Sequence, residues 1–195
     1  MATGKALKIS SIGIIALGAN QPLGDFAPEL TLRQAYDALE EASLQIVARS
    51  QFYATPAFPD PSEPEYVNSC VTVETALSPK ALLEVLHGIE RRLGRARVQR
   101  WGARTLDLDL LTYGITILPD LETYQRWAAL PVSEQIARTP DHLILPHPRI
   151  ADRPFVLVPL RDVAPLWQHP VTGKTADQML EALPKEDIAA IRPLD

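Results

Sequence analysis

The order in which apolar patterns follow one another constrains the fold of this chain most. Two segments, residues 31–42 and 79–93, have the apolar spacing of amphipathic helices, and each lies between short apolar runs typical of strands. The expected order is therefore strand, helix, strand, strand, helix, strand, which predicts a ferredoxin-like α+β sandwich. The predicted strands cover residues 8–17, 44–53, 66–74 and 106–111.

Local signals set the ends of the predicted elements. Residues 31–34 have the spacing of a capping box, which places the first helix start at Thr31. Ser78 is suited to cap the second helix, Pro79 to its first helical position and Gly94 to its end. Four prolines between residues 54 and 64 predict a stiff loop without regular structure.

The C-terminal part of the chain is less regular. The stretch 115–141 has no clear pattern apart from helical character at 121–127, residues 155–160 form a further apolar run, and 176–183 predict a short helix. Since no repeat, low-complexity tract or linker is present, we expect one domain over residues 1–195 with an inserted segment at about 115–141.

Composition narrows the classes of protein to consider. The 195 residues are 46% hydrophobic and 22% charged, as is ordinary for a globular domain. The longest apolar stretch, residues 12–17, is far shorter than the ~18 residues of a membrane span, and no signal-peptide pattern precedes it. Cys70 is the single cysteine, so no internal disulfide can form. We expect a cytoplasmic protein, monomeric and without a membrane partner.

Positive charge is concentrated in one short segment. The net charge of −5 argues against a general nucleic-acid binder, yet residues 91–104 hold six arginines and no acidic residue. Such a positive island on an acidic protein attracts a compact anion. The arginines are Arg91, Arg92, Arg95, Arg97, Arg100 and Arg104.

Two carboxylates follow this island on a predicted strand. Because successive side chains of a strand alternate between faces, Asp107 and Asp109 project from one side, opposite the leucines at 106, 108 and 110. Like charges this close disfavour each other unless cations neutralise them. Magnesium fits, because it takes carboxylate oxygens and completes its shell with water and substrate phosphates.

Both features also have simpler interpretations. An Asp-x-Asp pair can be the solvated face of an edge strand, and Arg91 and Arg92 can lie near a helix C-terminus because cations are favourable there. The combination is more informative than either part. A metal that bridges phosphates, beside fixed guanidinium groups, is what phosphoryl transfer requires.

Three smaller patches are candidate binding elements. His87 and Glu90 share one helix face, although such a spacing is also common for surface pairs. Residues 55–58 with Tyr66 and Asn68 could bind a flat heterocycle or form a packed loop. Residues 147–149 and 153–155 form a second basic patch, or a turn.

Several of these segments share their order with one known family. The stretch 100–110, RWGARTLDLDL, resembles the signature of the 6-hydroxymethyl-7,8-dihydropterin pyrophosphokinase family. Supporting segments are residues 17–20, 52–56, 66–68, 145–149 and 153–157. This resemblance implies the same ferredoxin-like fold, and transfer of pyrophosphate from ATP to the pterin hydroxymethyl group with release of AMP, in folate biosynthesis.

The resemblance also implies roles for individual residues. Asp107 and Asp109 would bind two magnesium ions and, with Arg95 and Arg97, would form the catalytic group. Trp101 and Phe155 would sandwich the pterin, and Asn68 would contact its edge. The other ATP-site residues would be His87, Glu90, Arg100, Arg104, His147 and Arg153, and the other pterin-site residues Thr55, Pro56, Phe58 and Tyr66.

Some positions depart from the family pattern. His87 stands where glutamine is frequent, Ala103 where proline is usual and Phe58 where leucine is commoner, and the stretch 114–146 is longer than in compact members. We expect the loop 95–104 to close over bound substrates.

Two other classes of protein share part of this pattern. An RNA-recognition module has the same element order, but residues 66–71 lack its aromatic pattern. A metal-dependent transferase acting on nucleotide sugars would explain the two aspartates, but not the arginines, Asn68 or Trp101.

Overall fold

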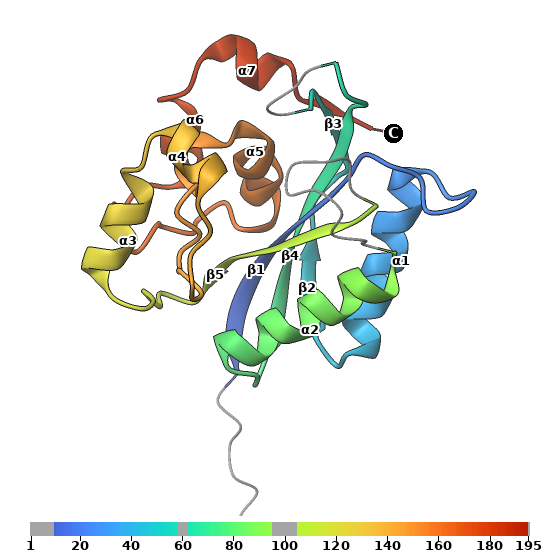
Figure 1. Cartoon of the computed structure of the whole chain (residues 1–195), viewed down its shortest axis with the longest axis horizontal. Helices are drawn as coiled ribbons and strands as arrows, with labels where there is room; N and C mark the ends of the chain where they lie inside the picture. Colours follow the sequence, from blue (N-terminus) through green and yellow to red (C-terminus); the bar gives the residue numbers. More distant parts are fainter. Residues whose placement is uncertain (1–9, 58–61, 95–104, 195) are drawn as a thin grey trace, which may run out of the picture.

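The chain folds around one antiparallel sheet (Figure 1). The computed structural model describes residues 10–57, 62–94 and 105–194. The N-terminal elements are β1 (Ser11–Ala19), α1 (Pro28–Glu41), β2 (Gln45–Arg49), β3 (Tyr53–Thr55), β4 (Tyr66–Thr75), α2 (Pro79–Arg92) and β5 (Asp107–Tyr113).

The sheet order confirms the predicted fold. Its strands lie in the order β5, β1, β4, β3, β6, and β2 also pairs with β4. The single strand predicted at 44–53 is therefore two strands, β2 and β3, which pair with opposite ends of β4. Counting β2 and β3 as one interrupted strand gives the fourth, first, third and second strands in spatial order, the ferredoxin-like arrangement.

The sheet is buried on both faces. Figure 1 shows α1 and α2 together on one face and α5 (Pro154–Val163) on the other. Ile15 and Leu17 of β1 belong to the core that includes buried residues of α1 and α2, whereas Ile14 belongs to the core under α5. This second core explains why β1 is almost continuously apolar rather than alternating.

The predicted helix ends are partly confirmed. The Ser78 side chain accepts a hydrogen bond from the Ala81 amide at 3.3 Å, and α2 ends just before Gly94, whose φ is +81°. The capping box predicted at Thr31 is wrong, because α1 begins at Pro28. Proline presets the helical φ at that position, so the helix starts one turn earlier and Thr31 is buried within it.

The C-terminal half adds short helices. The inserted segment carries α3 (Leu121–Ala128), as its pattern predicted, and also α4 (Val132–Ala137). A 3-10 turn (Ile150–Asp152), α5, α6 (Ala176–Leu180), α7 (Lys185–Ala189) and β6 (Arg192–Pro193) complete the chain. Within the described residues, no helix has the length and apolar character that crossing a membrane requires.

A buried histidine joins the inserted segment to the C-terminal region. The His169 side chain is 1% exposed, and its Nε2 lies 2.9 Å from the Tyr124 hydroxyl of α3. Its Nδ1 accepts hydrogen bonds from the Val171 and Thr172 amides at 3.2 and 3.4 Å. Nδ1 is therefore unprotonated, and burial lowers the pKa of His169 below its usual value.

We predict that His169 makes folding sensitive to mild acid. Because its pKa is lower in the folded than in the unfolded state, the unfolded chain alone takes up this proton as the pH falls below about 6.5. The free energy of unfolding should then fall, by at most about 1.4 kcal/mol per pH unit from this group.

Chemical denaturation of the His169→Gln variant between pH 7 and 5 tests this dependence. The variant should lose less stability across that range than the wild type. His142→Gln, which changes an exposed histidine, is the matched control and should follow the wild type. Equal slopes for His169→Gln and wild type would contradict the prediction.

Candidate active site

Strand register places the chemically distinctive residues in one row across the sheet. Gly18 of β1 pairs with Asp107 of β5 on one side and with Asn68 of β4 on the other. Asn68 in turn pairs with Tyr53 of β3. Directly paired residues of antiparallel strands share a face, and at about 4.8 Å per strand the backbones of Asp107 and Asn68 lie about 10 Å apart.

Gly18 keeps the middle of this row open. A Cβ atom at this position would lie 3.0 Å from Asn68 Oδ1 and 3.8 Å from the Tyr66 ring. Glycine therefore lets the Asn68 amide lean over β1 without a steric clash. The Asn68 Nδ2 donates to Thr55 Oγ1 at 2.7 Å, and both side chains are buried. Thr55 thus fixes the orientation of an amide that retains further hydrogen-bonding capacity.

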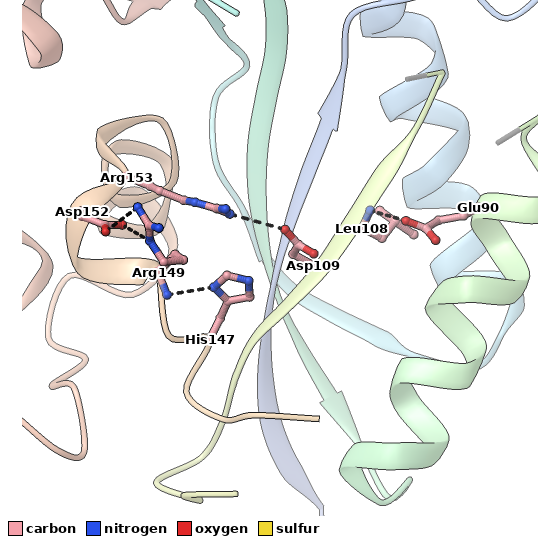
Figure 2. Close-up of polar contacts among 7 residues, drawn as sticks. All are labelled: Glu90, Leu108, Asp109, His147, Arg149, Asp152 and Arg153. Atoms are coloured by element: carbon pink, nitrogen blue, oxygen red, sulfur yellow. Dashed lines mark hydrogen bonds and ion pairs between the residues drawn. The ribbon is translucent and has the colours of Figure 1, made fainter. Parts of the chain in front are cut away.

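The two aspartates lie on the face that α5 covers. Leu106, Leu108 and Leu110 are buried in the core on the α1 and α2 side, so the predicted alternation along β5 is confirmed. Figure 2 shows the Asp109 carboxylate directed toward Arg153. The closest approach is 3.9 Å, beyond a hydrogen bond, and the Asp109 side chain is 41% exposed. This carboxylate is accessible to a hard cation.

The segment after the insertion brings an imidazole to the same site. The His147 amide donates to the Leu111 carbonyl at 2.7 Å, which ties this segment to β5. His147 Nδ1 accepts from the Arg149 amide at 3.1 Å, and Arg149 pairs with Asp152 (Figure 2). The second basic patch of the sequence is thus a structured element at the site.

The environment of His147 keeps its ring neutral. Burial, followed by the positive charge of Arg153, lowers the pKa of His147 to about 3. Since Nδ1 is an acceptor, the neutral ring carries its hydrogen on Nε2 and can donate it to an anion. The Arg153 guanidinium, 5.8 Å above the Phe155 ring, supplies positive charge nearby.

Glu90 and His87 lie on α2, on the other face of the sheet. Glu90 is 1% exposed, and its carboxylate accepts a hydrogen bond from the Leu108 amide at 2.8 Å (Figure 2). His87 is half-buried three residues earlier on the same helix. The ATP contacts that the resemblance implies for these two residues remain predictions.

Part of the predicted site falls outside the described residues. These positions are Phe58, Arg95, Arg97, Arg100, Trp101 and Arg104. Arg91 and Arg92 are exposed, and Arg92 pairs with Glu41 at 2.8 Å, which agrees with the simpler interpretation of both as solvated residues near a helix C-terminus. Of the pterin candidates, Thr55, Tyr66 and Asn68 are adjacent across β3 and β4.

Two further pterin candidates lie within the described residues. Pro56 is exposed after β3, and Phe155 is half-buried at the start of α5. The sequence interpretation missed the role of Gly18 and the contact of Glu90 with Leu108. The glycine within residues 17–20 was a signal for the first, whereas nothing in the sequence indicated the second.

The fold and the site together indicate a protein that binds phosphate groups, because paired carboxylates, a neutral imidazole and a guanidinium lie on one face of the sheet. The sequence model of 7,8-dihydro-6-hydroxymethylpterin-pyrophosphokinase (HPPK) matches residues 14–165. The chain belongs to this family, so the resemblance seen in the sequence is confirmed.

Individual relatives agree with this assignment. The chain is 39% identical over 153 residues to 2-amino-4-hydroxy-6-hydroxymethyldihydropteridine pyrophosphokinase of Synechocystis, covering 78% of this chain and 66% of that protein. It is 34% identical over 179 residues to the enzyme of the same name from Methylorubrum extorquens, covering 92% and 97%. The crystal structure of Plasmodium falciparum HPPK-DHPS has a similar fold, with a TM-score of 0.62, 17% identity, and coverage of 89% of this chain and 45% of that chain.

We predict that Gly18→Ala weakens pterin binding roughly tenfold, or ~1.4 kcal/mol. The new Cβ would displace the Asn68 amide, which lies 3.0 Å away. Fluorescence titration with the pterin, in the presence of a non-hydrolysable ATP analogue, measures the affinity. Gly13→Ala, in the same strand but against Leu82, is the control and should alter stability alone. Unchanged pterin affinity in Gly18→Ala would show that the pterin does not bind beside Gly18 and Asn68.

A second prediction concerns the protonation state of His147. Because its folded-state pKa is about 3, its ring should stay neutral, with the hydrogen on Nε2, from pH 8 down to pH 5. Long-range nitrogen–proton NMR correlations of the imidazole distinguish the two tautomers and the charged ring. A titration of His147 near pH 6.5 would show that its surroundings do not exclude the proton.

Proposed function

We propose that this protein transfers pyrophosphate from ATP to the hydroxymethyl group of 6-hydroxymethyl-7,8-dihydropterin, releasing AMP, in folate biosynthesis. Its family and its relatives' names support this reaction. The main structural support is the row of Asp107, Gly18 and Asn68 across the sheet. Its two ends carry a carboxylate and an amide held by Thr55 on the same sheet face, and their backbones lie about 10 Å apart. That spacing suits a phosphate chain on one side and a heterocycle on the other.

Asp107 and Asp109 are the proposed ligands of two magnesium ions. The donor set fits: both residues offer carboxylate oxygens on one face, and Asp109 is partly exposed. Among the described residues, no group of three or more His, Cys, Asp or Glu is arranged to hold a metal ion by itself. Magnesium commonly completes its shell with water and substrate phosphate oxygens, which would be the remaining ligands here. When bound, magnesium would neutralise charge on the phosphates.

His147 and Arg153 are the proposed triphosphate contacts. A neutral imidazole that donates from Nε2 binds a phosphate oxygen without adding repulsion toward Arg153. The resemblance also implies triphosphate contacts for Arg95, Arg97, Arg100 and Arg104, which lie, with the loop closure expected from the sequence, outside the described residues.

The pterin would occupy the other end of the row. Asn68 would read the edge of the ring, with its amide held by Thr55, and Tyr66 would lie alongside. Phe155 and Trp101 would sandwich the ring, because aromatic faces stack on a flat heterocycle. Pro56 and Phe58 would complete this pocket.

The proposed chemical step is in-line attack at the β-phosphorus. A bond forms between the hydroxymethyl oxygen and the β-phosphorus, and the bond from that phosphorus to the oxygen retained by AMP breaks. His147 is a poor general base, since Nδ1 already accepts a hydrogen bond and Nε2 holds the hydrogen. One aspartate of the pair is the nearest candidate to accept the hydroxyl proton, and positioning would supply most of the acceleration.

The RNA-recognition alternative is disfavoured by the fold. Such modules bind bases on the sheet face opposite their two helices. Here α5 packs on that face, and Ile14, Cys70 and Leu111 are buried beneath it. A cytoplasmic location, a monomeric state and the single-domain boundary stay predictions.

Incubation with ATP, magnesium and hydroxymethyldihydropterin, followed by quantification of AMP, tests the proposal. We expect pterin-dependent AMP release, and in Asp109→Asn a loss of roughly 10²- to 10³-fold in kcat, because a charge that holds the metal is removed. Asp187→Asn, which changes an exposed carboxylate on α7, is the matched control.

Two outcomes would contradict this assignment. Absence of pterin-dependent AMP release at every magnesium concentration would refute the pyrophosphokinase activity. Near-normal turnover of Asp109→Asn, with the fold intact by circular dichroism, would refute the metal assignment alone.

A further inference from the structure

Among the described residues, Glu90 is the most deeply buried carboxylate, and it lies on the opposite face of the sheet from Asp107 and Asp109. It is 1% exposed and shares the buried face of α2 with Leu86 and Ile89. A carboxyl group is almost never buried to this extent unless its oxygens are hydrogen-bonded or paired. Its burial therefore calls for a specific structural or functional reason.

The group that it contacts lies between the two metal-site candidates. Glu90 Oε1 accepts the backbone N–H of Leu108 at 2.8 Å, in a buried contact (Figure 2). Leu108 separates Asp107 from Asp109, and the peptide group that bears this N–H also contains the Asp107 carbonyl. Since a peptide group is planar, holding its N–H also sets the direction of the Asp107 backbone.

The position of β5 in the sheet explains why this amide needs a partner from outside the ladder. Within the described residues, β5 pairs with β1 alone and forms one edge of the sheet. Amides along an antiparallel edge strand point alternately toward the partner strand and away from it. The Leu108 amide points away, toward α2, and the glutamate satisfies a donor that would otherwise be buried without a partner.

Two contacts thus hold the strand between the aspartates. The Leu108 side chain is buried in the core that includes residues of α1 and α2, and its amide is bound by Glu90. Both contacts leave the opposite face to the carboxylates. Metal ligands depend on such support, and loss of an outer contact commonly weakens metal binding 10- to 100-fold.

We propose that Glu90 is a positioning residue, which fixes the β5 backbone at Leu108 so that Asp107 and Asp109 present their carboxylates together to magnesium. The inference rests on the proposed function for its metal and assigns Glu90 a task through the protein backbone. The contact with the Leu108 amide requires an oxygen acceptor at this place, which an amide side chain also offers.

Three substitutions separate this role from a direct contact with ATP. Glu90→Gln keeps a carbonyl oxygen of the same reach, Glu90→Leu removes the acceptor, and Glu90→Asp keeps the charge but is one methylene shorter. Leu39→Ala, in the same core on α1, is the control for general destabilisation.

Mn²⁺ affinity, measured by electron paramagnetic resonance with a non-hydrolysable ATP analogue, is the first readout. Hydrogen-exchange protection of the Leu108 amide is the second, and neither requires turnover. For Glu90→Gln we expect Mn²⁺ affinity within about threefold of the wild type and a protected amide. For Glu90→Leu and Glu90→Asp we expect 10- to 100-fold weaker Mn²⁺ binding and lost protection, while Leu39→Ala keeps both.

Each alternative outcome overturns the proposal. Equal losses in Glu90→Gln and Glu90→Leu would show that the charge itself matters, as a direct contact with ATP or metal requires. Unchanged Mn²⁺ affinity in Glu90→Asp and Glu90→Leu would show that the backbone contact does not control the carboxylates. If Glu90→Leu does not fold, the Mn²⁺ affinities and Leu108 amide protection of Glu90→Gln and Glu90→Asp are compared instead. Equal values in these two variants would overturn the proposal.

The wild type and the Glu90 variants together distinguish failure of the proposed pyrophosphokinase activity from failure of the positioning role of Glu90. A wild type that releases no AMP, with the expected Mn²⁺ pattern among the variants, would refute the pyrophosphokinase activity and leave the role of Glu90 supported. An active wild type whose Glu90 variants all bind Mn²⁺ normally would refute the positioning role alone.

Discussion

The pairing register of β1 with its two neighbours is the constraint on which the rest of the structure depends. Gly18 meets Asp107 on one side and Asn68 on the other, and this alignment creates the row that crosses the site. A slip of one residue would turn every side chain of a strand to the other face. It would bury the aspartates and expose the leucines of β5. Such a slip of β5 would be costly, because it would place two carboxylates in the apolar core under α1 and α2.

The two faces of the sheet have separate tasks, and this separation explains how a rigid site is built on an edge strand. The face under α1 and α2 holds β5 through buried leucines and through the bond from the Leu108 amide to Glu90. The other face presents the carboxylates to the 147–153 segment, which is itself tied to β5 through the Leu111 carbonyl. A site anchored from both faces needs little reorganisation when charge develops.

Electrostatics at the site follow from burial as much as from sequence. The 147–153 segment contains one histidine and two arginines, yet burial keeps His147 uncharged, and Arg149 pairs with Asp152. Arg153 remains as the cation that faces Asp109. Within the 147–153 segment, a neutral hydrogen-bond donor beside the Arg153 guanidinium suits a phosphate substrate that arrives with its own metal ions.

The sequence by itself determined the order of strands and helices, the alternation that puts both aspartates on one face of β5, and the family. These depend on local spacing, which a single segment carries in full. It did not determine the break between β2 and β3, the start of α1 at Pro28, or the second core under α5. Nor did it indicate that the missing side chain of Gly18 leaves space for the Asn68 amide, or that Glu90 binds the Leu108 amide. Only the tertiary structure decided these features, because strand register and burial depend on residues far apart in the chain.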